Sequence, residues 1–323
     1  MKLIAECCQN HNGNMGILKQ MIWEAAEGGA THAKIQTIFA EDLSFREEFE
    51  QGAVDADGET LVIKRPYEPE YERLKGLELT VTQHDLFVQE CKRAGLVPLT
   101  TAFNLTCIPE IRKLGWRSVK VASYDCGSLP LITALADSFE ELIVSTGATF
   151  DEEIEVTAKF LNERKIRHTL LHCVTIYPTP LKAMHLNRLQ YLRGLTSSVG
   201  LSNHSLTAQD GVKADMVALY LGADVIERHF TVLPPDQTRD GKVSITKDHL
   251  RQIVDFAAMD SDAQRDYITR NIPEYEEMLG QRTRLLSHAE LLNRAYYRGR
   301  FCNRIEGRQI FNWEQDVRRA CGV

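Results

Sequence analysis

The chain has 323 residues, of which 43% are hydrophobic and 26% are charged, and its formal net charge is -7 at pH 7. This length suits a large α/β barrel with an appendage, or two domains, rather than one small core. The negative charge argues against a nucleic-acid-binding surface, and no apolar run is long enough to cross a membrane.

The eight cysteines do not have the spacing of a disulfide framework or of a structural zinc site. Cys7 and Cys8 are adjacent, the others are isolated, and no CxxC pair occurs. The first residues run into an apolar strand without the basic and apolar regions of a secretory signal. We therefore expect buried, reduced thiols in a cytoplasmic protein.

Short apolar segments alternate with amphipathic segments along most of the chain. The expected strands are Lys2–Glu6, Ala33–Thr37, Val97–Thr101, Ser118–Ala122, Leu142–Ser145, Thr169–Cys173, Ser198–Leu201 and Val225–His229. The expected helices between them include Ile17–Glu27, Gln83–Ala94, Glu152–Glu163 and Ala208–Leu221. Eight alternations favour an α/β fold of the (β/α)8 or TIM-barrel type, and no GxGxxG follows the first strand to indicate a dinucleotide-binding sheet.

Two segments depart from this alternation and set the expected domain boundaries. Residues 43–79 form a long, charged insertion after the second strand, and loops of that length are usually lids or interface elements. Residues 261–323 follow the last barrel helix, with helical patterns over Asp262–Arg282 and His288–Arg300. We expect a barrel over residues 1–260 and a helical C-terminal extension over residues 261–323.

Polar residues gather where the expected strands end, which is the functional rim of such a barrel. Lys34 and Gln36 are two residues apart and so share one side of their strand. His204 and His229 end neighbouring strands and can share a divalent metal ion. The remaining lysines and hydroxyls suit a ligand with a phosphate and a carboxylate. The polar rim residues also include Glu6, Thr100, Thr101, Lys120, Ser123, Ser145, Tyr177, Ser202 and Glu227.

Several of these motifs together resemble the sialic acid synthase, or N-acetylneuraminate synthase, family. They are "AECCQNHNG", "AKIQT", "LTTAF", "VKVAS", "VSTGA", "LLHCVTIYPTP", "VGLSNHS" and "GADVIERHFT", and they span roughly Ile4 to Ser244. The resemblance implies a homodimeric barrel enzyme that condenses phosphoenolpyruvate with an N-acyl amino sugar. The product is a nonulosonic acid, and the metal is Mn²⁺ or Mg²⁺.

The resemblance also implies a role for each matching residue. The metal ligands are His204 and His229. The sugar and the reacting centre are contacted by Glu6, Gln36, Tyr177 and Asp240, and the catalytic set adds Lys34 and Lys120. The residues implied to bind phosphoenolpyruvate are Lys34, Thr101, Lys120, Ser123, Ser145, Thr175 and Ser202.

Two departures from the family pattern concern the sugar side of the site. Thr175 stands where the family commonly has Asn, so one amide contact is lost. Family members usually carry a C-terminal antifreeze-like domain that supplies an arginine to the sugar, and this sequence stops at Val323 after "SHAELLNRAYYRGRF", which is typical of the linker. We therefore predict that the insertion covers the barrel mouth or a dimer interface, with Arg46, Lys64 or Arg65 near the sugar pocket.

Two other functions remain open from the residues alone. A class I aldolase would use Lys34 or Lys120 to form a Schiff base with its substrate. A non-catalytic binding or assembly module would keep the barrel without turnover, although the anion and metal residues would then have no evident reason to remain.

Overall fold

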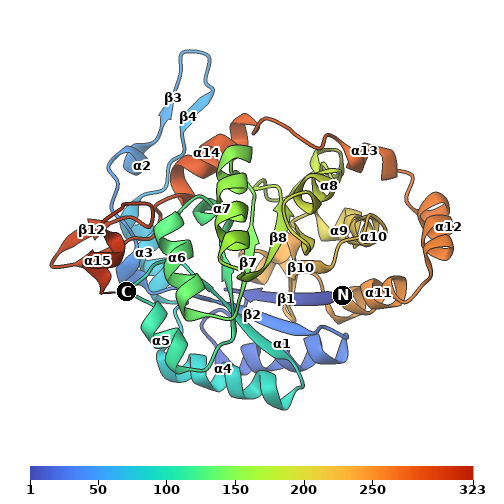
Figure 1. The fold of residues 1–323 in the computed structure, drawn as a ribbon, viewed down its shortest axis with the longest axis horizontal. Helices are drawn as coiled ribbons and strands as arrows, with labels where there is room; N and C mark the ends of the chain where they lie inside the picture. Colours follow the sequence, from blue (N-terminus) through green and yellow to red (C-terminus); the bar gives the residue numbers. More distant parts are fainter. Residues whose placement is uncertain (323) are drawn as a thin grey trace.

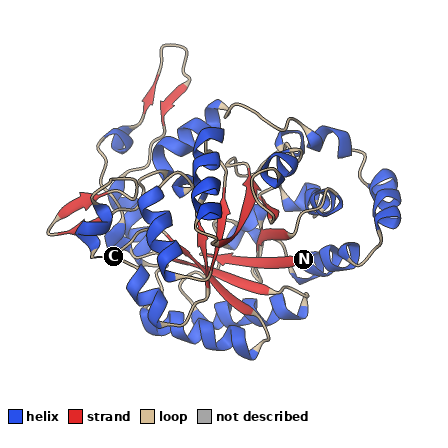
Figure 2. Ribbon diagram, viewed as in Figure 1, coloured by secondary structure: helices blue, strands red, loops and turns tan. Residues whose placement is uncertain are grey.

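The centre of the molecule is a closed barrel of parallel strands, seen in a computed structural model that describes residues 1–322 (Figures 1 and 2). Val323, the last residue of the expected extension, lies outside the described residues. Each expected strand overlaps an observed one, which confirms the TIM-barrel prediction. In order around the barrel the strands are β1 (Lys2–Cys8), β2 (His32–Thr37), β5 (Val97–Ala102), β6 (Ser118–Val121), β7 (Glu141–Ser145), β8 (Arg167–Cys173), β9 (Val199–Asn203) and β10 (Val225–His229).

Helices cover the outside of the barrel, and the main core fills the space between them and the strands. The helices that connect successive barrel strands or follow the last one are α1 (Met15–Glu27), α4 (Val81–Arg93), α5 (Ile108–Lys113), α6 (Leu129–Ser138), α7 (Asp151–Glu163), α8 (Arg188–Arg193), α9 (Thr207–Asp210), α10 (Lys213–Tyr220) and α11 (Lys247–Ala257). Short 3₁₀ turns are η1 (Ala40–Asp42), η2 (Ser123–Asp125), η3 (Leu181–Ala183), η4 (Pro235–Gln237) and η5 (Gly241–Val243). None of the helices described here combines the length and apolarity needed to cross a bilayer.

The inside of the barrel changes from apolar to polar along each strand. A separate cluster of buried side chains, Ile4, Leu99, Ile143, Leu171 and Val225, fills its lower part. Because successive strand residues alternate between two faces, the next inward positions on the same strands carry polar groups. Ile4 is thus followed inward by Glu6, and Val225 by Glu227. The apolar cluster closes the bottom of the barrel and leaves a polar mouth.

The insertion after β2 forms a small structure of its own. It contains α2 (Glu48–Gln51), a hairpin of β3 (Ala53–Val54) and β4 (Thr60–Val62), and α3 (Tyr67–Lys75). Figure 1 shows the hairpin projecting away from the barrel, whereas α3 lies against the body of the molecule. Only part of the insertion can therefore reach the barrel mouth.

The C-terminal segment contains more separate elements than the sequence patterns predict. The expected helix over 262–282 is two helices, α12 (Ser261–Asn271) and α13 (Tyr275–Leu279), because Pro273 excludes the helical conformation at the residue before it. The helix expected over 288–300 is α14 (His288–Tyr297), which opens with a capping box between Ser287 and Glu290. The remaining elements are β11 (Asn303–Ile305), β12 (Arg308–Ile310) and α15 (Val317–Cys321).

A buried ion pair joins the last barrel strand to the helix before it. Arg228 of β10 points out of the barrel, and its Nη1 lies 2.8 Å from Asp215 Oδ2 of α10, with both side chains fully buried. The guanidinium also donates to Ser205 Oγ, Thr207 Oγ1 and the carbonyl oxygen of Val243. These bonds connect β10 with the loops after β9 and β10, so Arg228 fixes the segments that carry part of the mouth.

We expect Arg228→Met to lower the free energy of unfolding by about 3–5 kcal/mol, because it leaves the Asp215 charge buried without an opposite charge. Urea denaturation at neutral pH measures the change. The double variant Arg228→Met with Asp215→Leu should recover most of the loss, since neither charge then remains. Arg265→Met, which removes an exposed arginine of α12, is the control and should change stability little. A single Arg228→Met variant as stable as this control would contradict the assignment.

Candidate active site

A cavity of about 490 Å³ opens at the C-terminal ends of the barrel strands. It brings together nearly all of the residues for which the sequence predicts a role, although they come from eight strands and the loops after them. Those lining it are Glu6, Lys34, Gln36, Thr101, Lys120, Ser123, Ser145, Tyr177, Ser202, His204, His229 and Asp240.

The floor of the cavity is a buried group of two lysines and two glutamates. Lys34 Nζ is paired with Glu6 and lies 3.8 Å from Glu227 Oε2, and it donates to Thr101 Oγ1 at 3.0 Å. Lys120 Nζ lies 3.1 Å from Glu227 Oε1. The formal charges of these four side chains therefore balance, and an anion that binds must compete with Glu6 and Glu227 for the lysines.

Burial and charge act in opposite directions on these groups. Burial would raise the pKa of Glu227, but the charges of Lys120 and Lys34 and a hydrogen bond from Ser202 outweigh it and lower the pKa to about 2. Burial lowers the pKa of Lys34 to about 7, with Lys120 adding to the effect and Glu227 opposing it. Glu227, for which the sequence assigns no specific role, is thus the residue that keeps two lysines buried here.

Two serine hydroxyl groups also line the cavity, and one of them has no protein partner in the part of the chain that the structure describes. Ser145 Oγ is buried and accepts or donates no hydrogen bond within the described residues, although Ser145 lines the cavity. Ser123 Oγ accepts a hydrogen bond from the backbone N–H of Gly147 at 3.2 Å. An unpaired buried hydroxyl is unfavourable unless a ligand or water satisfies it, so Ser145 is placed to bind a ligand oxygen.

Thr175 is the exception among the predicted residues, because it does not line the cavity. It is fully buried, and its methyl group lies 2.7 Å from where a Cβ on Gly147 would be. Its carbonyl oxygen accepts a hydrogen bond from Asn293 Nδ2 of α14 at 2.7 Å. The Thr175 side chain packs against the loop at Gly147, and its Oγ1 is buried without a hydrogen-bond partner among the described residues, so its contact with phosphoenolpyruvate stays a prediction.

One corner of the cavity has side chains suited to a divalent metal ion. His229 Nδ1 is buried without a hydrogen bond and lies 3.6 Å from Asp240 Oδ2. The ring of His204 is 5.2 Å from that of His229 and 4.1 Å from that of Tyr177, measured between centroids. Burial lowers the pKa of both histidines, so each offers a neutral imidazole. An unsatisfied imidazole nitrogen beside a carboxylate fits a metal ion well.

The outer wall of the cavity comes largely from residues that the sequence does not predict. Tyr297 at the end of α14 stacks on Tyr124 with ring centroids 5.0 Å apart. The segment "SHAELLNRAYYRGRF" is therefore more than a linker, and its capping box was a local signal for the helix. The unpredicted lining residues with polar side chains or aromatic rings are Cys8, Gln9, Arg73, Phe103, Tyr124, Asp125, Cys173, Arg239, Asn293, Tyr297, Arg300 and Phe301.

Arg65, Lys64 and Arg46 have different positions, although the sequence groups them as candidates for the sugar pocket. Arg65 lines the cavity. Lys64 instead donates to Gln51 Oε1 at 3.4 Å within the exposed insertion. Arg46 donates to the carbonyl oxygens of Ala295 and Arg298. Of the three alternatives, Arg65 is therefore the one at the cavity, whereas the Arg46 guanidinium satisfies carbonyl groups at the end of α14, which a cation there also stabilises.

Comparison with known proteins identifies the family. Residues 21–266 match the model of the NeuB family. The chain belongs to the NeuB family. This result confirms the resemblance to sialic acid synthases that the motifs indicate.

Relatives within the NeuB family cover most of the chain. An N,N'-diacetyllegionaminic acid synthase from Legionella pneumophila is 30% identical over 92% of this chain and 78% of its own length. A pseudaminic acid synthase from Campylobacter jejuni is 26% identical over 99% of this chain and 88% of its own length. The crystal structure of an N-acetylneuraminic acid synthetase from Leptospira borgpetersenii matches with a TM-score of 0.67 at 25% identity, covering 84% of this chain and 92% of that one.

The lowered pKa of Lys34 predicts that anion binding weakens with rising pH. Above about pH 7 the amine of the empty site loses its proton, whereas a bound anion favours the protonated form. The Kd of phosphoenolpyruvate should therefore rise between pH 7 and 9, by up to about tenfold per pH unit for one coupled proton. Titration calorimetry measures it. Lys34→Met, which has no amine to titrate, should bind more weakly and with a flatter pH profile; a flat profile in the unmodified protein would contradict the prediction.

Proposed function

We propose that this NeuB-family chain is a phosphoenolpyruvate-dependent synthase that joins phosphoenolpyruvate to an N-acyl amino sugar, giving a sialic-acid-like nonulosonic acid and phosphate. The observation that carries the proposal is the arrangement of one cavity. Two buried lysines and the unpaired hydroxyl of Ser145 lie at its floor, and two neutral histidines with a carboxylate lie at its rim. The names of the relatives, which are synthases of legionaminic and pseudaminic acids, agree with it.

Phosphoenolpyruvate is assigned to the floor because of its charge. Fully ionised, it carries three negative charges, which Lys34 and Lys120 partly offset while hydroxyl groups bind the remaining oxygens. Ser145 Oγ, which has no partner in the described part of the chain, would gain one from the ligand. The residues proposed to bind phosphoenolpyruvate are Lys34, Thr101, Lys120, Ser123, Ser145 and Ser202.

The aldehyde of the sugar is assigned to the rim, near Tyr177 and Asp240. His204 and His229 are the proposed ligands of Mn²⁺ or Mg²⁺, and such an ion polarises a carbonyl oxygen as a Lewis acid when bound. Gln36 lines the cavity between floor and rim and is proposed to contact the sugar hydroxyls. The sugar chain would extend toward Asn293 and Tyr297, which form part of the outer wall.

Glu6 is the proposed base for the second half of the reaction. The C3 carbon of phosphoenolpyruvate attacks the aldehyde carbon, and positive character then develops at C2. Water adds to C2 and loses a proton to Glu6, and the oxygen of the former aldehyde takes up a proton. Phosphate then leaves with the C–O bonding electrons while the C2 hydroxyl loses its proton, which leaves a ketone at C2. Glu6 is paired with Lys34 and accepts a hydrogen bond from the backbone N–H of Cys8 at 2.6 Å, so the position of its carboxylate is fixed.

A class I aldolase is the second candidate, and the lowered pKa of Lys34 favours it. An amine with a pKa near 7 is partly unprotonated at neutral pH, as a Schiff-base nucleophile must be. The pairing of Lys34 with Glu6, however, holds the same nitrogen in an ion pair. Borohydride with pyruvate separates the two: a reduced adduct on Lys34, found by peptide mass, would favour the aldolase, whereas the synthase forms none.

Release of phosphate from phosphoenolpyruvate tests the main proposal. With Mn²⁺ and a panel of N-acyl hexosamines and their phosphates, we expect release only when an acceptor aldose is present. Lys120→Met should lower kcat/KM for phosphoenolpyruvate tenfold or more, while the KM of the acceptor changes much less, because only one substrate meets the lysine. Lys159→Met, at an exposed site on α7, is the control. Equal losses toward both substrates would argue against this placement of phosphoenolpyruvate.

A further inference from the structure

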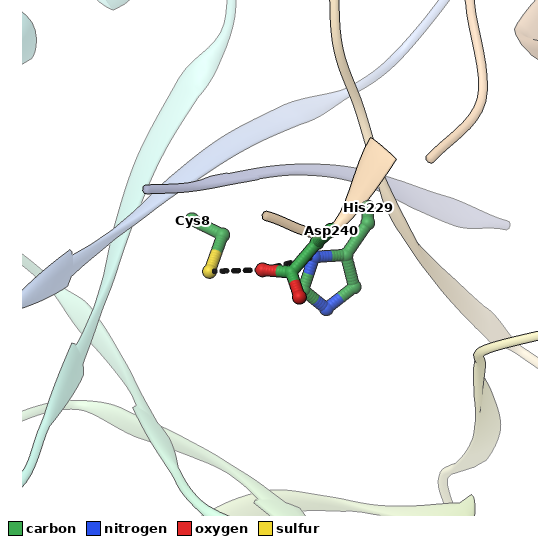
Figure 3. Close-up of side chains that lie close together, drawn as sticks. All are labelled: Cys8, His229 and Asp240. Atoms are coloured by element: carbon green, nitrogen blue, oxygen red, sulfur yellow. Dashed lines mark hydrogen bonds and ion pairs between the residues drawn. The ribbon is translucent and has the colours of Figure 1, made fainter. Parts of the chain in front are cut away.

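Cys8, His229 and Asp240 converge at the metal corner of the cavity (Figure 3). One ligand atom from each residue lies within 4.8 Å of the other two. Cys8 Sγ is 3.2 Å from Asp240 Oδ2, and His229 Nδ1 is 3.6 Å from the same oxygen. The three residues come from the end of β1, the end of β10 and the loop before η5, so the barrel itself brings them together.

The backbone at Cys8 is in an unfavourable conformation. Its φ of 46° lies in the left-handed region, which non-glycine residues rarely adopt. The pairing of β1 with β2 shifts its register between Glu6 and Cys8, at the same place. Left-handed conformations in non-glycine residues are unfavourable and cluster at functional sites. The result here is that the thiol lines the cavity beside Asp240 and His229.

One of the three converging ligand atoms has no hydrogen-bond partner in the described chain. His229 is 8% exposed, and its Nδ1 has no hydrogen-bond partner among residues 1–322. Asp240 Oδ2 accepts a hydrogen bond from the thiol, and a metal ion that displaced the thiol proton would replace that bond with two ligand bonds. A buried imidazole nitrogen, a carboxylate oxygen and a thiol sulfur form a typical mixed ligand set.

We propose that Cys8 binds the divalent ion together with His229 and Asp240, and that this thiolate shifts the preference of the site toward Zn²⁺, Co²⁺ or Fe²⁺ and away from Mg²⁺. Thiolate and imidazole ligands suit these softer ions, whereas Mg²⁺ favours sites of oxygen atoms alone. His204 lies close enough to His229 to join the set. The inference extends the metal of the proposed function, but it is tested by binding alone.

Cobalt provides a direct test, because a Co²⁺–thiolate bond gives a near-ultraviolet charge-transfer band that nitrogen and oxygen ligands do not give. We expect this band when the protein is loaded with Co²⁺, and its loss in Cys8→Ser. The affinity for Zn²⁺ should fall tenfold or more in that variant, while the affinity for Mg²⁺ stays within about twofold. Cys173→Ser is the matched control, since Cys173 is the other cysteine that lines the cavity, and it should keep the band.

The variant Cys8→Gly shows whether loss of the band in Cys8→Ser comes from the missing thiol or from misfolding. Glycine adopts a φ of 46° without strain, so this variant should fold at least as well as the unmodified protein while lacking the thiol. Absence of the band in the unmodified protein, or its survival in Cys8→Gly, would overturn the inference. Turnover without the band would support the proposed synthase and contradict only the binding of the metal by Cys8. The band without turnover would support metal binding by Cys8 and contradict the proposed synthase.

Discussion

The cavity depends on one carboxylate that stays ionised between two buried lysines. Glu227 lies close to both Lys34 and Lys120, and without it their like charges would repel each other in a region shielded from water. The same residue occupies the inward position next to His229, and Arg228 between them faces outward into its pair with Asp215. Three successive residues of β10 thus have three roles. Glu227 pairs with the lysines of the floor, Arg228 connects the barrel to α10, and His229 lies at the metal corner.

The inward-facing residues of the barrel strands are apolar at the bottom of the barrel and charged or polar at its mouth. The same strands therefore supply both the stabilising core and the binding groups. The lower inward positions are apolar and close the barrel, so the charged layer above has a water-excluded floor. In that environment each ionic contact is stronger than in water, and each unpaired charge is more unfavourable. The pairings among Glu6, Lys34 and Glu227 follow from this balance, because every charge placed there needs an opposite charge or a ligand.

The fold and the inner half of the site could be predicted because both follow from local patterns. Alternating apolar strands and amphipathic helices define the barrel, and the barrel then places strand-end residues such as Lys120 and His204 together. The outer half could not be predicted in this way. Tyr297 stacks on Tyr124 because the chain after the barrel returns to the barrel mouth, and no short sequence pattern predicts that contact. The contacts of Arg46 could not be predicted for the same reason, since the carbonyl groups it binds lie about 250 residues away in sequence.

The position of α14 has a consequence for how the protein is made. A ribosome completes all eight barrel strands before residues 288–301 emerge, and domains generally begin to fold during synthesis. Asn293 and Arg294 then join the barrel through the carbonyl oxygens of Thr175 and Ala148. The charged floor therefore exists before its outer wall, and the nascent barrel exposes its polar mouth to water until the last part of the chain binds across it.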